Sequence, residues 1–238
     1  MQTSNKPIGI IAAMNIEAEG ILARMTDVTA ETVSGVTFAE GKLHGIPCVV
    51  AVCGIGKVFA ALCAQTMILR YNPRLILNSG VAGSLNACLT IGDIAVAESL
   101  VQHDMDTSAL GDPVGMISGI HIVHLPCDAE ASERLANCAA TLEGVSVKRG
   151  VIASGDKFMS DGGEKRRIAD TFGAVACEME GAAIGQVCYV NQVPCAVMRA
   201  ISDGGDEAAA LDYPTFARMA ADRAVRAIDL FFADMAKP

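Results

Sequence analysis

Four apolar segments of the chain are each followed by carboxylates, hydroxyls or glycines, the residue types that perform acid–base chemistry. The residues that follow them are 12–17, 78–83, 154–159 with 177–181, and 199–204. Glu17, Glu180 and Asp203 would meet in one crevice, with Phe158 beside them, if the preceding segments are neighbours in a sheet. Separated carboxylates supply both an acid and a base when their surroundings push their pKa values apart. Such a pair is the minimum equipment for splitting a glycosidic bond with water through an oxocarbenium-like state.

Each of these patterns also has a simpler structural interpretation. A Glu in the first turn of a helix is usually a surface charge that the helix dipole favours. The Gly-x-x-Gly of residues 80–83 is typical of a tight turn that stops a strand, and Ser202-Asp203 is typical of a helix cap or Asx-turn. Glu178 and Glu180 are harder to explain in this way. They flank one residue in an apolar neighbourhood, and charges are costly to bury unless they are paired or used.

The segments that must position these groups alternate between strand-like and helix-like patterns. Short apolar runs predict strands at residues 7–13, 36–43, 46–52, 75–78, 91–100, 146–153 and 194–201, with a turn at His44-Gly45. Helices are predicted after an N-cap at Asn15 and over 57–70, 129–142, 180–191 and 213–236, with a basic helix after Gly162-Gly163. We therefore expect an α/β protein, a three-layer α/β/α single domain over residues 1–238 with a central mixed β-sheet and a flexible N-terminus at 1–6. Such folds place their sites at the carboxyl ends of the strands.

Two segments outside this alternation lead to separate expectations. Residues 103–127 are interrupted by glycines and prolines and predict a long loop, and loops of that length in compact domains are usually functional. The basic run Lys165-Arg166-Arg167 is interpreted as a solvated helix face.

Composition excludes several classes of protein. Of 238 residues, 52% are hydrophobic and only 19% are charged, which is the opposite of a disordered chain. The net charge of −9 argues against binding to nucleic acid or to an anionic membrane, because phosphate attracts Lys and Arg. No apolar stretch approaches the roughly 20 residues of a membrane span, and we see no secretory leader. The nine cysteines form no Cys-x-x-Cys pair, so we expect reduced thiols in a cytoplasmic protein without a bound metal.

Taken together, the motifs resemble the nucleoside phosphorylase/hydrolase superfamily. The likeness runs from about residue 7 to the C-terminus and is carried by Ile8–Glu17, Cys53–Lys57, Asn78–Gly83, Ile91–Ile94, Ala153–Phe158, Cys177–Gly181 and Arg199–Asp203. Within the superfamily it is greatest to the nucleosidases that hydrolyse 5′-substituted adenosines, such as methylthioadenosine, S-adenosylhomocysteine and 5′-deoxyadenosine, in methionine salvage and the activated methyl cycle. The resemblance implies a nucleoside phosphorylase-like fold, a small-molecule nucleoside substrate and no cofactor.

The resemblance also implies a role for individual residues. Glu17 would activate the attacking water as general base, and Asp203 would protonate N7 of adenine as general acid. The other implied substrate contacts are Ser202, which orients the acid; Arg199, which supports the water site; Glu180 and Met179 at the ribose; Phe158 and the backbone of Met159 at adenine; and Gly83 and Tyr213 around the ligand. A homodimer is implied as well, in which loop 103–118 reaches into the neighbour's 5′ pocket.

Some positions differ from the pattern and leave alternatives open. Val81 stands where a Ser is usual, Leu110 where a Phe is expected, and Tyr213 where a Phe is common. The preferred 5′ group is therefore open among methylthio, homocysteinyl, deoxy and aminodeoxyfutalosine-type substituents, with Leu110 and Met116 favouring a larger or more apolar one. A phosphate-dependent nucleoside phosphorylase is disfavoured, because a carboxylate at Glu17 would repel phosphate. A non-catalytic nucleoside-binding protein is the second alternative.

Overall fold

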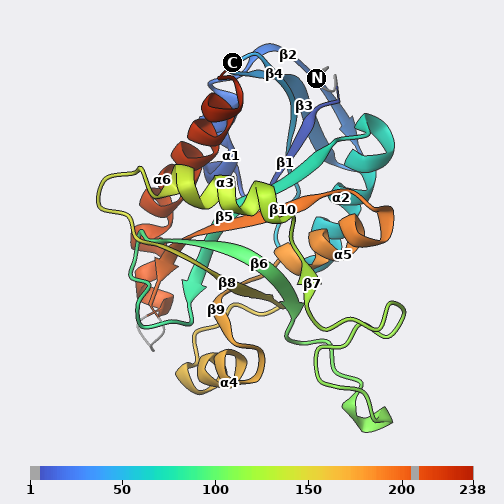
Figure 1. Cartoon of the computed structure of the whole chain (residues 1–238), viewed down its shortest axis with the longest axis vertical. Helices are drawn as coiled ribbons and strands as arrows, with labels where there is room; N and C mark the ends of the chain where they lie inside the picture. Colours follow the sequence, from blue (N-terminus) through green and yellow to red (C-terminus); the bar gives the residue numbers. More distant parts are fainter. Residues whose placement is uncertain (1–5, 205–208, 238) are drawn as a thin grey trace.

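The computed structural model describes residues 6–204 and 209–237, in which strands and helices alternate (Figure 1). The strands are β1 (Ile8–Ala12), β2 (Thr26–Val33), β3 (Val36–Leu43), β4 (Ile46–Val52), β5 (Leu75–Ser84), β6 (Ile94–Gln102), β7 (Leu125–Pro126), β8 (Val147–Ser154), β9 (Ala174–Glu178) and β10 (Cys195–Asp203). The helices are α1 (Asn15–Leu22), α2 (Lys57–Tyr71), α3 (Ala129–Ala139), α4 (Gly162–Phe172), α5 (Gly181–Asn191) and α6 (Ala209–Met235), with a 3₁₀ turn η1 (Ser108–Leu110). The expected flexible N-terminus lies outside the described residues, apart from the exposed Lys6.

The mixed sheet is organised around β5. On one side β1 runs parallel to its first half, and β9 pairs antiparallel with its last two residues. On the other side β10 runs parallel to nearly all of it. Strand β10 also pairs with β6, β6 with β8, and β8 with β9, so these strands and β5 form a closed ring. Strands β4, β3 and β2 extend the sheet beyond β1. The carboxyl ends of β1, β5 and β10 therefore meet at one edge of the sheet.

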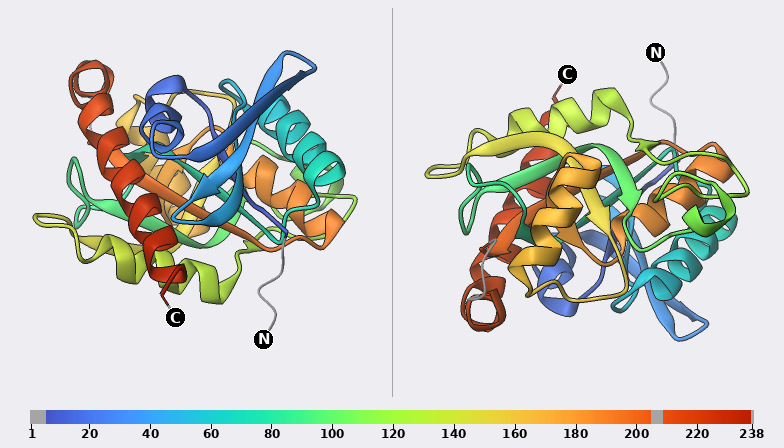
Figure 2. Two further views of the ribbon diagram at one scale, coloured as in Figure 1. Left: turned by 90° about the horizontal axis from the view of Figure 1, so that it is seen from above. Right: turned by 90° about the horizontal axis from the view of Figure 1, so that it is seen from below.

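Helices cover both faces, which confirms the three-layer α/β/α prediction. On one side α1, α3 and α6 bury residues such as Ala18, Leu135 and Phe231 against the sheet. On the other side α2 and α5 bury Met67 and Ile184. Figure 2 shows the same layers from above and below, with α6 on one side and α2 and α5 on the other. Coverage of both faces explains why β1 and β5 are buried almost throughout and show no alternation of buried and exposed residues.

The predicted stop of β5 at the Gly-x-x-Gly segment is wrong. The strand continues to Ser84, and neither Gly80 nor Gly83 has a positive φ. Glycine is needed there because carboxylates lie directly against the backbone. A Cβ on Gly80 would stand 2.6 Å from Oε1 of Glu17, and one on Gly83 would stand 2.7 Å from Oδ1 of Asp203.

The predicted N-cap at Asn15 is also wrong, because Asn15 is already helical and the cap is the extended Met14. The hairpin of β3 and β4 is confirmed residue for residue, with positive φ at His44 and Gly45 as a two-residue hairpin turn requires. The edge strand β2 was not predicted. Nearly all of its residues are exposed, so its sequence does not alternate between buried apolar and exposed polar positions.

The remaining boundaries differ from the predictions by a few residues. Helix α4 includes Gly162 and Gly163, α3 ends at Ala139, and α6 begins at Ala209. Strand β9 was not predicted as a strand. Residues 103–127 form the expected loop, interrupted only by η1 and β7 among the named elements. The structure contains no helix that is long and apolar enough to cross a membrane, among the residues it describes.

Candidate active site

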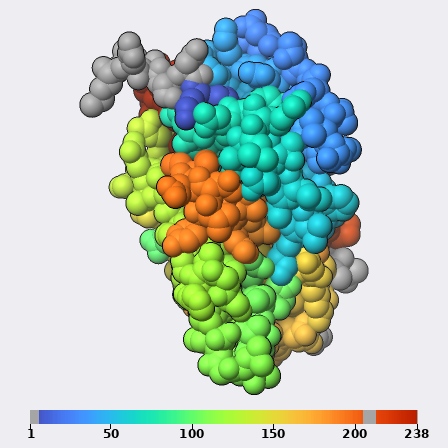
Figure 3. Space-filling view, turned by 90° about the vertical axis from the view of Figure 1, so that its right-hand side faces the viewer, coloured from blue at the N-terminus to red at the C-terminus, as the bar shows by residue number. Residues whose placement is uncertain are grey.

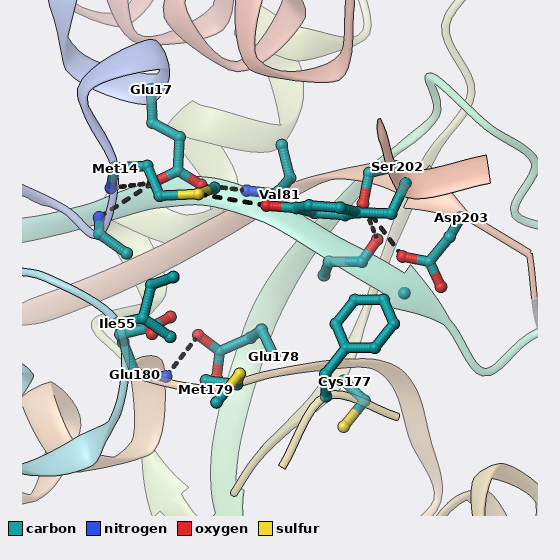
Figure 4. A pocket seen from close by; sticks show the side chains of 15 residues that line it. Met14, Glu17, Ile55, Val81, Cys177, Glu178, Met179, Glu180, Ser202 and Asp203 are labelled. Atoms are coloured by element: carbon teal, nitrogen blue, oxygen red, sulfur yellow. Dashed lines mark hydrogen bonds between the residues drawn. The ribbon is translucent and has the colours of Figure 1, made fainter. Parts of the chain in front are cut away.

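A pocket of about 430 Å³ opens at the edge where β1, β5 and β10 end. Its volume is in the range of small-ligand sites. The lining residues are Ala13, Met14, Glu17, Ile55, Val81, Ala82, Gly83, Phe158, Cys177, Glu178, Met179, Glu180, Ser202, Asp203 and Tyr213. Figure 4 shows the carboxyl groups of Glu17 and Asp203 at opposite ends of this pocket, with Met179 and Glu180 along another wall. The structure thus brings together the three carboxylates that the sequence singled out.

Glu17 is a buried carboxylate, not a surface charge, and is only 2% exposed. It accepts hydrogen bonds of 2.9 Å from the backbone N–H groups of Ala13, Met14 and Val81. Burial raises the pKa of Glu17 above its ordinary value, while the charge of Arg199 and these N–H donors oppose the rise. A carboxylate whose pKa is shifted towards neutrality and that faces a pocket is suited to accept a proton from water.

Asp203 ends β10 and is held by donors on both carboxyl oxygens. Ser202 Oγ donates to Oδ2 at 3.1 Å, and Lys165 Nζ donates to Oδ1 at 3.0 Å. The interpretation of Lys165-Arg166-Arg167 as a solvated face is therefore wrong for its first member, which is only 2% exposed. Lys165 shares the inward face of α4 with Ile168 and Phe172, at i, i+3 and i+7, whereas both arginines are exposed.

Arg199 lies behind the pocket wall, buried against Glu178. Its guanidinium donates to the Glu178 carboxylate and to Asn78 Oδ1. Glu178 also accepts from Ser154 Oγ and from the backbone N–H of Gly181 at 2.8 Å. Burial alone would lower the pKa of Arg199, but the surrounding carboxylates, Glu178 first, raise it above its usual range. This fixed cation supports the pocket from beneath and does not line it.

Glu180 caps α5 and faces the pocket beside Met179. Its Oε1 accepts from the N–H of Gly56, just before α2, at 2.8 Å. Burial, followed by the charge of Glu178, raises the pKa of Glu180 to about 7. A carboxyl in this position can accept hydrogen bonds from the hydroxyls of a sugar.

Two aromatic rings stand at the mouth of the pocket. Phe158 and Tyr213 meet edge to face with ring centroids 5.4 Å apart, and Phe158 is 43% exposed. The Tyr213 hydroxyl donates to Met14 Sδ at 3.1 Å. Met159, like Arg199, does not line the pocket, because its side chain packs with Ile168 and Phe172.

Several residues that support the site were not predicted from the sequence. Glu178 stood out as a carboxylate in apolar surroundings, but no role was predicted for it. Asn78 and Ser154 belong to strand ends that were flagged, yet no partner was foreseen for either. The apolar spacing of Ile168 and Phe172 could have shown that Lys165 faces inwards.

An α/β/α fold whose mixed sheet ends in an apolar pocket with carboxylates at its two ends defines the nucleoside phosphorylase-like class of proteins. Comparisons with known proteins agree. The model of the Phosphorylase superfamily matches residues 7–233. The 5′-methylthioadenosine/S-adenosylhomocysteine nucleosidase of Shewanella loihica is 35% identical over 210 residues, covering 88% of this chain and 91% of the relative.

Solved structures give the same result. The nucleosidase of that name from Neisseria meningitidis, in complex with methylthio-immucillin-A, superposes with a TM-score of 0.91 at 32% identity over 95% of this chain and 98% of that one. Futalosine hydrolase of Helicobacter pylori superposes with a TM-score of 0.91 at 35% identity, covering 96% and 98% of the two chains. The chain belongs to the phosphorylase superfamily and, within it, to the 5′-methylthioadenosine/S-adenosylhomocysteine nucleosidases, which are N-glycosyl hydrolases.

Proposed function

We propose that this protein hydrolyses the N-glycosidic bond of 5′-substituted adenosines, releasing adenine and the 5′-substituted ribose. The observation that carries the proposal is the placement of two buried carboxylates, Glu17 and Asp203, at opposite ends of one apolar pocket. Cleavage of this bond needs a proton on the departing base and a water molecule at the anomeric carbon, and the two ends of the pocket supply these separately.

In the proposed reaction Glu17 takes a proton from the water, and Asp203, oriented by Ser202, protonates N7 so that adenine leaves as a neutral molecule. The sugar becomes cation-like in the transition state, and a carboxylate at Glu180 stabilises that charge while binding the ribose hydroxyls. Met179 packs under the sugar. Well-placed proton transfer of this kind typically contributes about 10²–10⁴-fold to the rate.

The rest of the site fits the adenine base. Phe158 would stack on its face, and the backbone of Met159, not the buried side chain, would read its edge. Gly83 and Tyr213 would border the ligand, and Arg199 would support the water site through its charge. The apolar lining excludes water and strengthens electrostatic interactions within the pocket.

Hydrolysis is favoured over phosphorolysis by the charges around the pocket. Phosphate sites are generally built from Arg guanidinium groups and backbone donors. None of the described lining residues is Arg or Lys, and a buried carboxylate stands at Glu17. The test is adenine release from methylthioadenosine, followed by ultraviolet absorbance, with and without added phosphate. Release without phosphate supports hydrolysis, strict dependence on phosphate would indicate a phosphorylase, and binding without release would indicate a non-catalytic protein.

The preferred 5′ substituent is best determined by a panel of 5′-substituted adenosines. We expect methylthioadenosine and S-adenosylhomocysteine to be cleaved, in keeping with the named activity of the relatives. We propose that this cleavage serves methionine salvage and the activated methyl cycle. A futalosine-type nucleoside belongs in the panel, because the similar Helicobacter pylori structure is called futalosine hydrolase.

We further propose that the protein acts as a homodimer through the face formed by α2 and α5. Figure 3 shows these helices side by side, with the loop that contains η1 next to them. Large apolar side chains are exposed here, with Val58 at 71%, Leu62 at 55%, Val190 at 52% and Leu110 at 84%. An apolar surface of this kind is typical of a protein interface. Loop 103–118 would then bring Leu110 and Met116 towards the partner's 5′ pocket, and light scattering would measure the mass of the assembly.

We also propose a cytoplasmic location, on the basis of the cysteines. All nine are free thiols, most of them buried, which supports the proposal of a reducing, cytoplasmic environment.

A further inference from the structure

A buried lysine outside the pocket lining contacts the candidate acid, and the proposed reaction does not yet use it. Lys165 reaches from α4 and donates one hydrogen bond to Asp203 Oδ1 at 3.0 Å and another to the carbonyl oxygen of Gly204 at 2.6 Å. Both side chains of the ion pair are 2% exposed. The lysine therefore links α4 to the candidate acid at the end of β10 and to the residue that follows it.

Among the residues that the structure describes, the other elements around Asp203 contribute groups that stay neutral near pH 7. Strand β9 presents the Cys177 thiol and α6 presents the Tyr213 hydroxyl, and burial raises the pKa of each. Strand β5 presents Gly83, and the neighbouring Ser202 donates a hydrogen bond. The Lys165 ammonium thus supplies positive charge against a carboxyl group in a low-dielectric setting, which favours the ionised carboxylate.

An ionised Asp203 conflicts with the task of a general acid. N7 of a purine nucleoside is a hydrogen-bond acceptor, and so is a carboxylate, so the two repel each other unless a proton lies between them. The acid must therefore gain a proton between the ligand-free state and the reacting complex.

We propose that Lys165 is a positioning residue that holds Asp203 in place as the ionised carboxylate in the ligand-free enzyme, so that binding of the purine nucleoside is coupled to uptake of one proton. The proposal rests on the function proposed above. The proton comes from solvent, sits on Asp203 and passes to N7 as the glycosidic bond breaks. Glu17 takes a proton from the attacking water and returns it to solvent, so a complete turnover consumes none.

The proton uptake is measurable on the wild-type chain by titration calorimetry at pH 7 in two buffers of different ionisation enthalpy. The probe is the carbocyclic analogue of 5′-methylthioadenosine, which keeps N7 but lacks the ring oxygen needed to stabilise the cation. Its matched control is the 7-deaza analogue, in which carbon replaces N7. We expect uptake of about one proton per site with the first ligand and none with the second.

Variants then test whether Lys165 is the cause. Lys165→Met removes the ammonium beside Asp203 and should raise the pH at which this carboxyl group ionises. Proton uptake at pH 6 should therefore fall, and the alkaline limb of kcat/KM, which reports the free enzyme, should move to higher pH. Lys165→Arg should retain the uptake. Arg166→Met removes the same charge from an exposed position of the same helix and should behave like the wild type.

Equal uptake with the two ligands, in a wild type that releases adenine, would overturn the proposal. So would wild-type uptake in Lys165→Met, or an equal loss in Arg166→Met. If Lys165→Met does not fold, the comparison of the two ligands on the wild type decides alone. A wild type that releases no adenine would instead reject the proposed function.

Discussion

The close approach of Gly80 to Glu17 makes Gly80→Ala a sensitive test of the proposed base. The added Cβ would stand 2.6 Å from Oε1 and 3.0 Å from the carboxyl carbon of Glu17. An ordinary contact begins at 3.4 Å, so the carboxylate must retreat by about 0.8 Å, the difference between these two distances. The carboxylate has little freedom to do so, because three backbone N–H groups hold it at 2.9 Å.

A displacement of this size should lower kcat for adenine release by about 10–100-fold, since a misplacement near 1 Å costs up to about 10² in rate. We expect KM to change little, because the water and not the nucleoside loses its partner. Gly119→Ala is the matched control, as Gly119 is exposed and its added Cβ would meet no atom within 4 Å. If Gly80→Ala turns over within twofold of the wild type, the position of Glu17 does not control the reaction.

Four further substitutions test the remaining parts of the site. Asp203→Asn should lower kcat by about 10²–10⁴-fold while the carbocyclic ligand still binds, and a wild-type rate would reject the acid role. Glu17→Gln should still bind the nucleoside but release adenine much more slowly, which is checked by measuring bound nucleoside and released adenine separately. An unchanged kcat would contradict the role of Glu17 as base. Glu178→Gln leaves the Arg199 charge buried without its carboxylate and should lower the free energy of unfolding by about 3–5 kcal/mol in urea, whereas an unshifted midpoint would refute the role of this ion pair. The pKa of Glu180 is raised from 4.5 to about 7, so the folded state binds more protons than the unfolded state between these values and wild-type stability falls as pH rises through them. Glu180→Gln has no carboxyl group to lose this proton, so its Tm relative to that of the wild type should rise between pH 4.5 and 7. A difference in Tm that stays constant over this range would contradict the assignment.

The glycines of β5 show where prediction from sequence succeeded and where it failed. The spacing of Gly80 and Gly83 marked the segment as special, but turn statistics suggested a strand stop. What selects glycine is contact with carboxylates from α1 and β10, which lie far away along the chain. Local sequence carries no signal for such a contact, because the contacting atoms come together only after folding.

Lys165 is the complementary case. A run of three basic residues normally lies in solvent, and Arg166 and Arg167 do. The first member is turned inwards by the helical period it shares with Ile168 and Phe172. Its partner Asp203 belongs to another element, so the ion pair could not be read from either segment alone.

The sequence by itself determined the layered α/β fold and the identity of the carboxylates at the strand ends, because hydrophobic periodicity and residue type are local properties. The tertiary structure decided which carboxylates share a pocket, which are paired with buried cations, and in which direction burial shifts their pKa values. Those quantities depend on the distances between segments and on the exclusion of water, and both arise only when β1, β5 and β10 lie side by side.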